Sequence, residues 1–354
     1  MDKKRILASL VVLCILAVLV YLQYRHWRTF DWGAFWSQTH RVKKLHVFHG
    51  IALIYLAYVV RAIRWKIFLR PVRPSTKFWD LVSPTVIGFT GLALLGRAGE
   101  FIRPYLIARR TNLPFSSQLA VWAVERIFDI GAFGVLMALA IFLPTALPSI
   151  PHPEYYQKFR FAGFLLIAIV AGTAVVAVLI ARYGEAAAGF AERTASRIST
   201  SLAHKVGERV REFGAGLNTI HGPISLLWLS VVSVGMWYMI ALAYKEVTLS
   251  YAAPALDIPV SQLLILIFAS MLGSMLQLPA VGGGSQMATI AVLSSVFDAP
   301  PEMAASCGIL LWLVTFAAVV PLGLVLAHHE RLSLRKLSVE SHHAGETDPA
   351  APAA

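Results

Sequence analysis

The chain has 354 residues, of which 57% are apolar and only 14% are charged, and its formal net charge is +12. Soluble domains carry about 25% charged residues, so this composition excludes an ordinary soluble protein and indicates an all-α, polytopic membrane protein. The period-two alternation that a membrane β-barrel requires is absent. The basic residues lie between apolar runs, where cytoplasmic flanks and anionic lipids explain them better than nucleic acid does.

Six apolar runs are long enough to form full membrane-spanning helices of about 20 residues. They cover residues 6–24, 47–64, 117–143, 161–181, 224–244 and 303–327. The first run has no small-residue cleavage site, so we expect a retained helix rather than a signal peptide. Residues 25–46 are predicted to form a polar loop whose tryptophans, Trp27, Trp32 and Trp36, lie at the membrane interface.

Two further apolar segments are interrupted by glycine and proline. Residues 81–95 would reach only about 22 Å as a helix, which is short of a hydrocarbon core of about 30 Å. Residues 260–278 and 287–297 flank the break LPAVGGGSQ. We expect both segments to be broken or re-entrant helices, which are tolerated where they line a cavity or are packed within protein.

Most of the 31 lysines and arginines fall on one side if both termini are cytoplasmic, which is the orientation that the positive-inside rule favours. The first broken segment would then enter from the cytoplasm and the second from the opposite side. Short, interrupted segments in corresponding positions of two halves are typical of an inverted repeat with a binding site between the halves.

Residues 184–221 are polar but carry apolar side chains at helical spacing, with arginines and a lysine between them. This pattern predicts an amphipathic helix that lies in the membrane interface. We expect one integral membrane domain, residues 1–337, followed by a disordered cytoplasmic tail, residues 338–354.

Three charged residues lie inside the third apolar run, which is costly in hydrocarbon and calls for a reason. Glu125, Arg126 and Asp129 have spacings that let Arg126 reach Asp129 on one helical face. Because the trio has a net negative charge, we expect a further cation nearby, with Arg97 or Arg103 as the candidates. Two interpretations stay open: a structural ion cluster that locks this helix to a neighbour, and a polar lining for a lipid headgroup or a coupling proton.

Arg97, Glu100 and Arg103 are spaced by three and share one face if their segment is helical. A guanidinium group offers planar, bidentate contact with a phosphodiester or a carboxylate, so anionic lipid headgroups are the expected partner. The plainer interpretation is positive-inside flanking, which we adopt for Arg109 and Arg110.

The glycines Gly282, Gly283 and Gly284 permit backbone geometry that is closed to other residues and mark a turn between two half-helices. They also offer backbone N–H groups at the start of the second half-helix as an anion or headgroup site. No Lys-Ser/Thr follows them, so a nucleotide-binding loop is not indicated. Gln277 and Gln286 bracket the break and are expected to hydrogen-bond into the same cavity.

Enzyme signals are poor, because no HExxH, GxSxG or metal-type Cys/His cluster occurs in the sequence. The pairs His328–His329 and His342–His343 are expected to be solvated rather than metal-bound. We therefore expect no catalytic residue, no metal and no cofactor, and a protein that is not an enzyme.

Four motifs resemble the transmembrane domain of lysylphosphatidylglycerol synthase, the flippase-like family. They are RAIRWKIFLRP (61–71), LGRAGEFIRPYLI (95–107), ERIFD (125–129) and LPAVGGGSQ (278–286). The resemblance implies a bacterial inner-membrane protein whose relatives move aminoacylated phospholipid or other amphipathic lipids between leaflets. The soluble aminoacyl-transferase domain of such relatives is missing, so the chain resembles the translocase portion alone. One departure is Val281, where the family often has proline, and no acidic residue follows the glycines.

We therefore expect a flippase-like lipid transporter with a polar groove between the two broken segments and membrane lipids as partners. The predicted headgroup-binding residues are Arg97, Glu100, Arg103, Glu125, Arg126, Asp129, Gln277, Gly282, Gly283, Gly284 and Gln286. One alternative is a non-transporting membrane partner or scaffold of a lipid-modifying or glycosyl-transferring enzyme. A further alternative is a membrane-embedded enzyme that uses Glu125 or Asp129 as a base.

Overall fold

The structure, a computed structural model, describes most of the chain in four long stretches. These are residues 30–142, 153–196, 223–275 and 283–330, with a few further residues between 199 and 211, and Leu332 and Glu340. The described stretches consist of helices joined by turns, which confirms the all-α fold class. The predicted helix at 6–24, most of the predicted tail, Gln277 and Gly282 lie outside the described residues.

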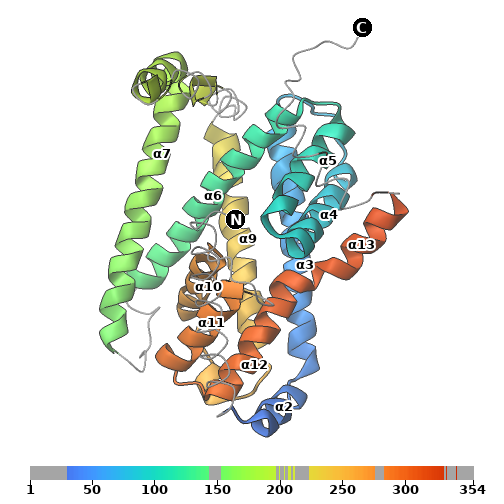
Figure 1. Ribbon diagram of the computed structural model, residues 1–354, viewed down its shortest axis with the longest axis vertical. Coiled ribbons are helices and arrows are strands. Elements are labelled where there is room, and N and C mark those ends of the chain that lie inside the picture. Colours follow the sequence, from blue (N-terminus) through green and yellow to red (C-terminus); the bar gives the residue numbers. More distant parts are fainter. Residues whose placement is uncertain are drawn as a thin grey trace, which may run out of the picture.

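Three of the predicted spans are confirmed as helices long and apolar enough to cross a membrane. They are α3 (Lys44–Leu69), α9 (Pro223–Leu249) and the stretch from Pro301 to His329, which comprises α12 (Pro301–Trp312), the π-helical turn η4 (Leu313–Ala317) and α13 (Val319–His329). The other two described runs fall in α6 (Phe115–Phe142) and α7 (Pro153–Ser196), and α7 packs beside α6 on the flank of the bundle (Figure 1).

Residues 32–40 form a helix, α2 (Trp32–His40), where the sequence predicted a loop, so that prediction is wrong for this piece. The reason is a helix cap, because the Asp31 carboxylate accepts a hydrogen bond from the Ala34 N–H at 2.9 Å. Trp32 and Trp36 remain exposed on this helix, as residues anchored in a membrane interface would be. The Thr39 hydroxyl lies 2.7 Å from that of Ser306 and ties α2 to α12.

The polar segment 184–221, which begins inside α7, folds back on itself. The backbone of α7 departs from helical angles at Tyr183, and the helix then continues to Ser196. Arg211 donates hydrogen bonds to Glu185 and Glu192, at 3.1 and 2.8 Å. In one uninterrupted helix residues 185 and 211 would be about 39 Å apart, so the segment turns between them. Its location in the membrane interface stays a prediction.

The first broken segment is a helical hairpin. It consists of α4 (Trp79–Leu95), the 3₁₀ helix η1 (Gly96–Phe101) and α5 (Ile102–Thr111). The α4 helix runs on through Pro84, and the chain reverses at Gly96, whose φ of 63° suits glycine. A hydrogen bond of 3.3 Å from Arg110 to the Asp80 carbonyl brings the end of α5 back to the start of α4.

The second broken segment is also a hairpin, formed by α10 (Val260–Met275) and α11 (Gly283–Val296). The Ser270 and Ser285 hydroxyls lie 2.7 Å apart and join the two arms close to the break. The two arms pack along each other in the lower half of the bundle (Figure 1).

The two hairpins enter the bundle from opposite ends, as the hydropathy pattern predicted. The Lys43 N–H donates to the Ser250 carbonyl at 2.8 Å, which sets the start of α3 beside the end of α9. Lys245 on α9 bonds the Ile258 carbonyl at 2.9 Å, so the start of α10 lies at that same end. The far end of α3 leads into α4, so the α4–α5 hairpin starts from the other end (Figure 1).

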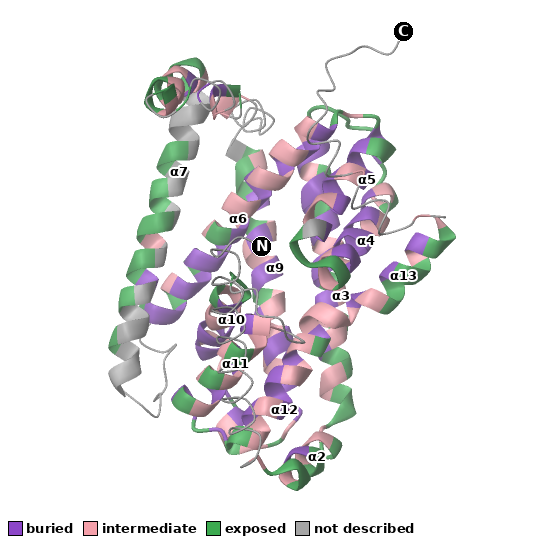
Figure 2. Ribbon diagram, viewed as in Figure 1, coloured by how far each residue is buried: buried purple, intermediate pink, exposed green. Residues whose placement is uncertain are grey.

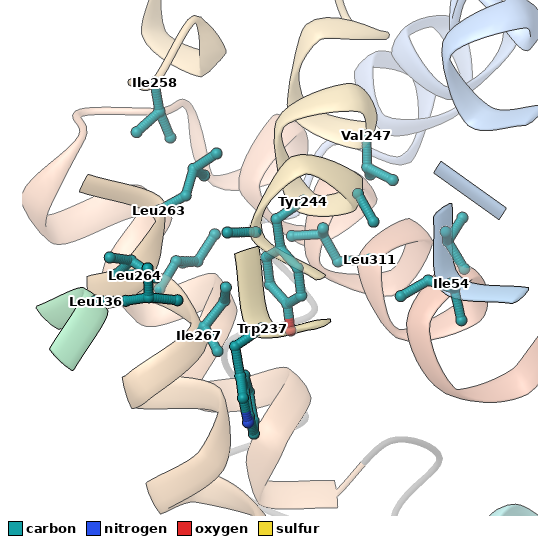
Figure 3. Close-up of a cluster of buried hydrophobic side chains, with 14 of the residues drawn as sticks. Ile54, Leu136, Trp237, Tyr244, Val247, Ile258, Leu263, Leu264, Ile267 and Leu311 are labelled. Carbon is teal, nitrogen blue, oxygen red and sulfur yellow. The ribbon is translucent and has the colours of Figure 1, made fainter. Parts of the chain in front are cut away.

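The largest apolar core lies where α3, α6, α9, α10 and α12 meet (Figure 2). Figure 3 shows part of it, with Trp237 and Tyr244 of α9 near Ile267 of α10 and Leu311 of α12. This core holds the two hairpins in place on either side of α3 and α9.

The close approach within the first hairpin gives a test of its packing. A Cβ atom on Gly99 would overlap the backbone of Gly91, which cannot move aside as a flexible side chain could. We expect Gly99→Ala to lower the free energy of unfolding by about 1–3 kcal/mol through overpacking, measured as a lower temperature of thermal denaturation in detergent.

The matched control is Gly131→Ala in α6, where a Cβ atom would meet nothing within 4 Å. There the substitution should leave stability unchanged or raise it by up to about 1 kcal/mol, because alanine favours helix. Equal denaturation temperatures for the two variants would contradict the packing described for the hairpin.

Candidate functional site

Two carboxylates of α6 form the centre of the site. Glu125 and Asp129 lie one turn apart on the helix and are 0% and 4% exposed. A buried carboxylate without partners would cost several kcal/mol, so this arrangement is stable only if cations and hydrogen-bond donors surround it.

Arg64 of α3 bridges the two carboxylates and is itself fully buried. Its Nη1 donates to Asp129 Oδ1 at 2.7 Å and to the Ser233 hydroxyl of α9 at 3.0 Å. Its Nη2 donates to Glu125 Oε1. A second donor to Asp129 Oδ1 is the Trp237 indole N–H, at 3.3 Å. One arginine thus connects α3, α6 and α9.

Arg103 of α5 holds Glu125 from the other side. Its two terminal nitrogens donate to the two oxygens of that carboxylate, with 3.2 Å between Nη1 and Oε1. This bidentate geometry is the strongest that arginine offers. The guanidinium also lies 4.5 Å from the ring centre of Trp65, whose indole N–H donates to Gln118 at 3.0 Å. The site therefore fixes the second arm of the first hairpin to α3 and α6.

Two more arginines flank the carboxylates more loosely. Arg126 lies 3.4 Å from Asp129, and its side chain is 41% exposed. Arg61 of α3 lies 3.5 Å from Asp129 Oδ2 and 3.9 Å from Glu125 Oε1, and its guanidinium is 4.9 Å from the centre of the Phe89 ring. Nη1 of Arg61 is buried and faces both carboxylates, but it makes no hydrogen bond among the described residues, so Arg61 is held less tightly than Arg64.

The cluster has an excess of positive charge. Four arginines, Arg61, Arg64, Arg103 and Arg126, surround two carboxylates, which leaves two positive charges uncompensated within this group. Charges in a poorly solvated environment interact over longer distances than in water, so the excess favours binding of an anion beside the cluster.

A pocket of about 1030 Å³ lies beside this cluster. The tip of the first hairpin contributes Gly96, Arg97 and Glu100, and the tip of the second contributes Ser274, Met275 and the start of α11. Mostly apolar and aromatic side chains of α3, α4, α9, α10 and α12–η4 form the remaining wall. Arg61 and Phe89 belong both to this wall and to the surroundings of the cluster, so they connect the two.

The structure divides the predicted site residues into two groups. Those that line the pocket are Arg97, Glu100, Gly283, Gly284 and Gln286. Those that form the buried cluster behind it are Arg103, Glu125, Arg126 and Asp129, and none of these is a lining residue of the pocket. Of the two cations that the sequence offered to the trio, Arg103 contacts Glu125, and the exposed Arg97 lies in the pocket.

Sequence reasoning missed Arg61 and Arg64, because arginines at the end of an apolar run are typical of positive-inside flanking. One signal could have found them. They are three residues apart and are followed by further apolar residues, so they share one face of a helix that continues to Leu69.

The bridging role of Arg64 gives a stability prediction. Arg64→Met should lower the free energy of unfolding by about 3–5 kcal/mol, because it removes one partner from a buried, hydrogen-bonded ion cluster. Thermal denaturation in detergent measures the loss. The control is Arg109→Met on the exposed end of α5, which should change stability by no more than about 0.5 kcal/mol. Equal stability of the two variants would show that the cluster does not hold the helices together.

The sequence profile of the family described as "Lysylphosphatidylglycerol synthase TM region" matches residues 6–323. A curated relative, "Glycosyltransferase AglD" of Haloferax volcanii, is 36% identical over 92 residues. That match covers 24% of this chain and 15% of the relative, so the chain spans only a small part of the length of the relative. No solved structure is detectably similar. Because the family profile covers nearly the whole chain, the protein belongs to the lysylphosphatidylglycerol synthase transmembrane-region family and is an integral membrane protein.

Proposed function

We propose that this chain moves a lipid with an anionic headgroup between the leaflets of the bacterial inner membrane and that both termini are cytoplasmic. The observation that carries the proposal is the pocket between the tips of two hairpins that enter from opposite ends. A site between two such interrupted segments is typical of transporters that work by alternating access.

The chemistry of the pocket suits a lipid headgroup. Moving a bare charged headgroup through hydrocarbon is prohibitively slow, because each charge loses its hydration. Arg61 and Arg97 replace part of that hydration with charge-assisted hydrogen bonds to a phosphate, while the acyl chains stay in the lipid. Glu100, on the same tip as Arg97, offers an acceptor for hydroxyl or amino groups of the headgroup.

In this proposal the buried cluster has a supporting role. Arg64, Glu125 and Asp129 form a fixed frame that holds Arg61 in position beside the pocket. Each carboxylate forms an ion pair with a buried arginine, and we therefore assign Glu125 and Asp129 a structural role in this proposal rather than the role of a general base.

The pocket cations give a functional prediction. Arg97→Ala should slow transfer of fluorescent phosphatidylglycerol across reconstituted vesicles by about 10- to 100-fold, because it removes a charge-assisted contact worth roughly 1.5–3 kcal/mol. Accessibility of the labelled headgroup to a reductant added outside the vesicles measures the transfer rate.

Arg109→Ala is the matched control, since Arg109 is an exposed arginine of α5 that does not line the pocket. It should transfer lipid as fast as the unmodified protein. If Arg97→Ala also transfers at the full rate while remaining folded, the pocket is not the headgroup site.

A second candidate function is a membrane partner of a glycosyl-transferring enzyme, and the match to a protein named as a glycosyltransferase favours it. The same vesicles discriminate between the two. Under the partner hypothesis, the purified chain transfers none of a set of lipids that differ in their headgroups. Deletion of the segment 184–221 should then abolish association with the enzyme.

A further inference from the structure

The structure brings three metal-ligating side chains together at the end of α3 that is remote from the buried cluster. His46 and His49 lie on neighbouring turns of α3, and Glu246 projects from the last turns of α9. The same carboxylate oxygen, Glu246 Oε2, lies 2.8 Å from His46 Nδ1 and 3.4 Å from His49 Nδ1. All three ligand atoms lie within 4.8 Å of one another. The sequence indicated no metal cluster, because Glu246 is remote from the histidines along the chain.

We propose that His46, His49 and Glu246 bind a divalent transition-metal ion of the zinc class and leave its fourth position open to water or a ligand. Two imidazoles and one carboxylate are a donor set that zinc uses in proteins. Tetrahedral bonds of about 2.0–2.1 Å place ligand atoms roughly 3.3–3.4 Å apart. The separation between His49 and Glu246 already has this value, His46 lies about half an ångström closer to Glu246 than this, and the two imidazole ligand atoms lie within 4.8 Å of each other.

The helices that carry the ligands are in close contact beside the three side chains. Gly50 follows His49 directly, and a Cβ atom on it would lie 3.3 Å from Val247 Cγ2, next to Glu246. The hydrogen bond from the Lys43 N–H to the Ser250 carbonyl fixes the two helix ends a few residues further along. Such pre-organisation lowers the entropy cost of binding an ion.

The charges around the cluster leave the Glu246 carboxylate available to a cation. The neighbouring Lys245 ammonium bonds Asp257 Oδ1 at 2.6 Å and the Ile258 carbonyl at 2.9 Å instead of Glu246. The side chains of His46, His49 and Glu246 are 31%, 50% and 25% exposed, so an ion can reach them from solvent.

The metal would join two helices that also form a wall of the pocket. Tyr58 and Arg61 of α3 and Trp237 and Tyr244 of α9 line the pocket, and Glu246 follows Tyr244 by two residues. A bound ion would therefore fix the distance between α3 and α9 at the start of α3 and the end of α9, outside the pocket. The inference does not depend on lipid transport, because metal binding is measured without any lipid substrate.

The experiment uses the full chain in detergent after removal of any polyhistidine tag. Cobalt(II) titration should give the visible absorption bands of a four-coordinate ion, and zinc should displace them at a stoichiometry of one. Zinc should also raise the denaturation temperature, because it binds the folded state. His49→Ala and Glu246→Gln should each weaken binding at least about tenfold.

The variant Glu246→Gln separates a metal site from a simple hydrogen bond between His46 and Glu246. Its amide oxygen has the same shape and still accepts that hydrogen bond, but it lacks the charge that a metal ligand supplies. The variant also remains informative if His49→Ala fails to fold. The controls are His40→Ala, on an exposed histidine of α2, and the double substitution His328→Ala/His329→Ala, and both should bind as the unmodified chain does.

Two results would overturn the proposal. One is that the unmodified chain shows no four-coordinate cobalt spectrum and no zinc-dependent stabilisation up to about 1 mM metal. The other is that Glu246→Gln binds zinc as tightly as the unmodified chain, while the double substitution at His328 and His329 abolishes binding.

Discussion

The desolvation of Glu125 and Asp129 is the constraint on which the arrangement of the bundle depends. Two carboxylates without water must be matched by donors from other helices, because α6 itself supplies only Arg126. Arg64 from α3 and Arg103 from α5 provide that match, so neither helix can move away from α6 without exposing a charge to hydrocarbon. The cluster therefore determines where α3 and the second arm of the first hairpin lie, and these two elements form one side of the pocket.

Hydropathy and the positions of glycine and proline were sufficient to predict the helical class and the two interrupted segments, because burial in lipid requires long apolar runs and breaks need glycine or proline. The two hairpins and their opposite directions followed from these rules. The position of the turn in the first hairpin could not be predicted in this way, since the segment carries several glycines and Pro84 is accommodated within α4. The loop predicted before α3 is a helix because a single aspartate, Asp31, caps it, and hydropathy does not register a cap.

The chemistry of the site was predicted less completely than the fold. Glu125 and Asp129 stood out because acidic residues inside an apolar run are rare. Their partners Arg61 and Arg64 did not, since a basic residue near a membrane end usually contacts water or anionic lipid. Arginine at the end of an apolar run is thus compatible with an exposed flank and with a buried ion partner. Only the packing of α3 against α6 and α9 distinguishes the two. The contact of His46 and His49 with Glu246 likewise depends on helix packing that local sequence does not specify.

The π-helical turn η4 has a mechanical consequence for the first hairpin. A π turn widens the helix, so some of its carbonyls need donors from elsewhere. The Tyr55 hydroxyl of α3 donates to the Ala318 carbonyl at 2.7 Å, and the Thr90 hydroxyl of α4 lies 3.3 Å from the Val319 carbonyl. The Tyr55 hydroxyl thus holds the long helix at its least regular point, and Thr90, whose hydroxyl donates to the Val86 carbonyl of its own helix at 2.9 Å, contacts it there as well. Because α4 packs along α13, a tilt of the first hairpin would also displace α13.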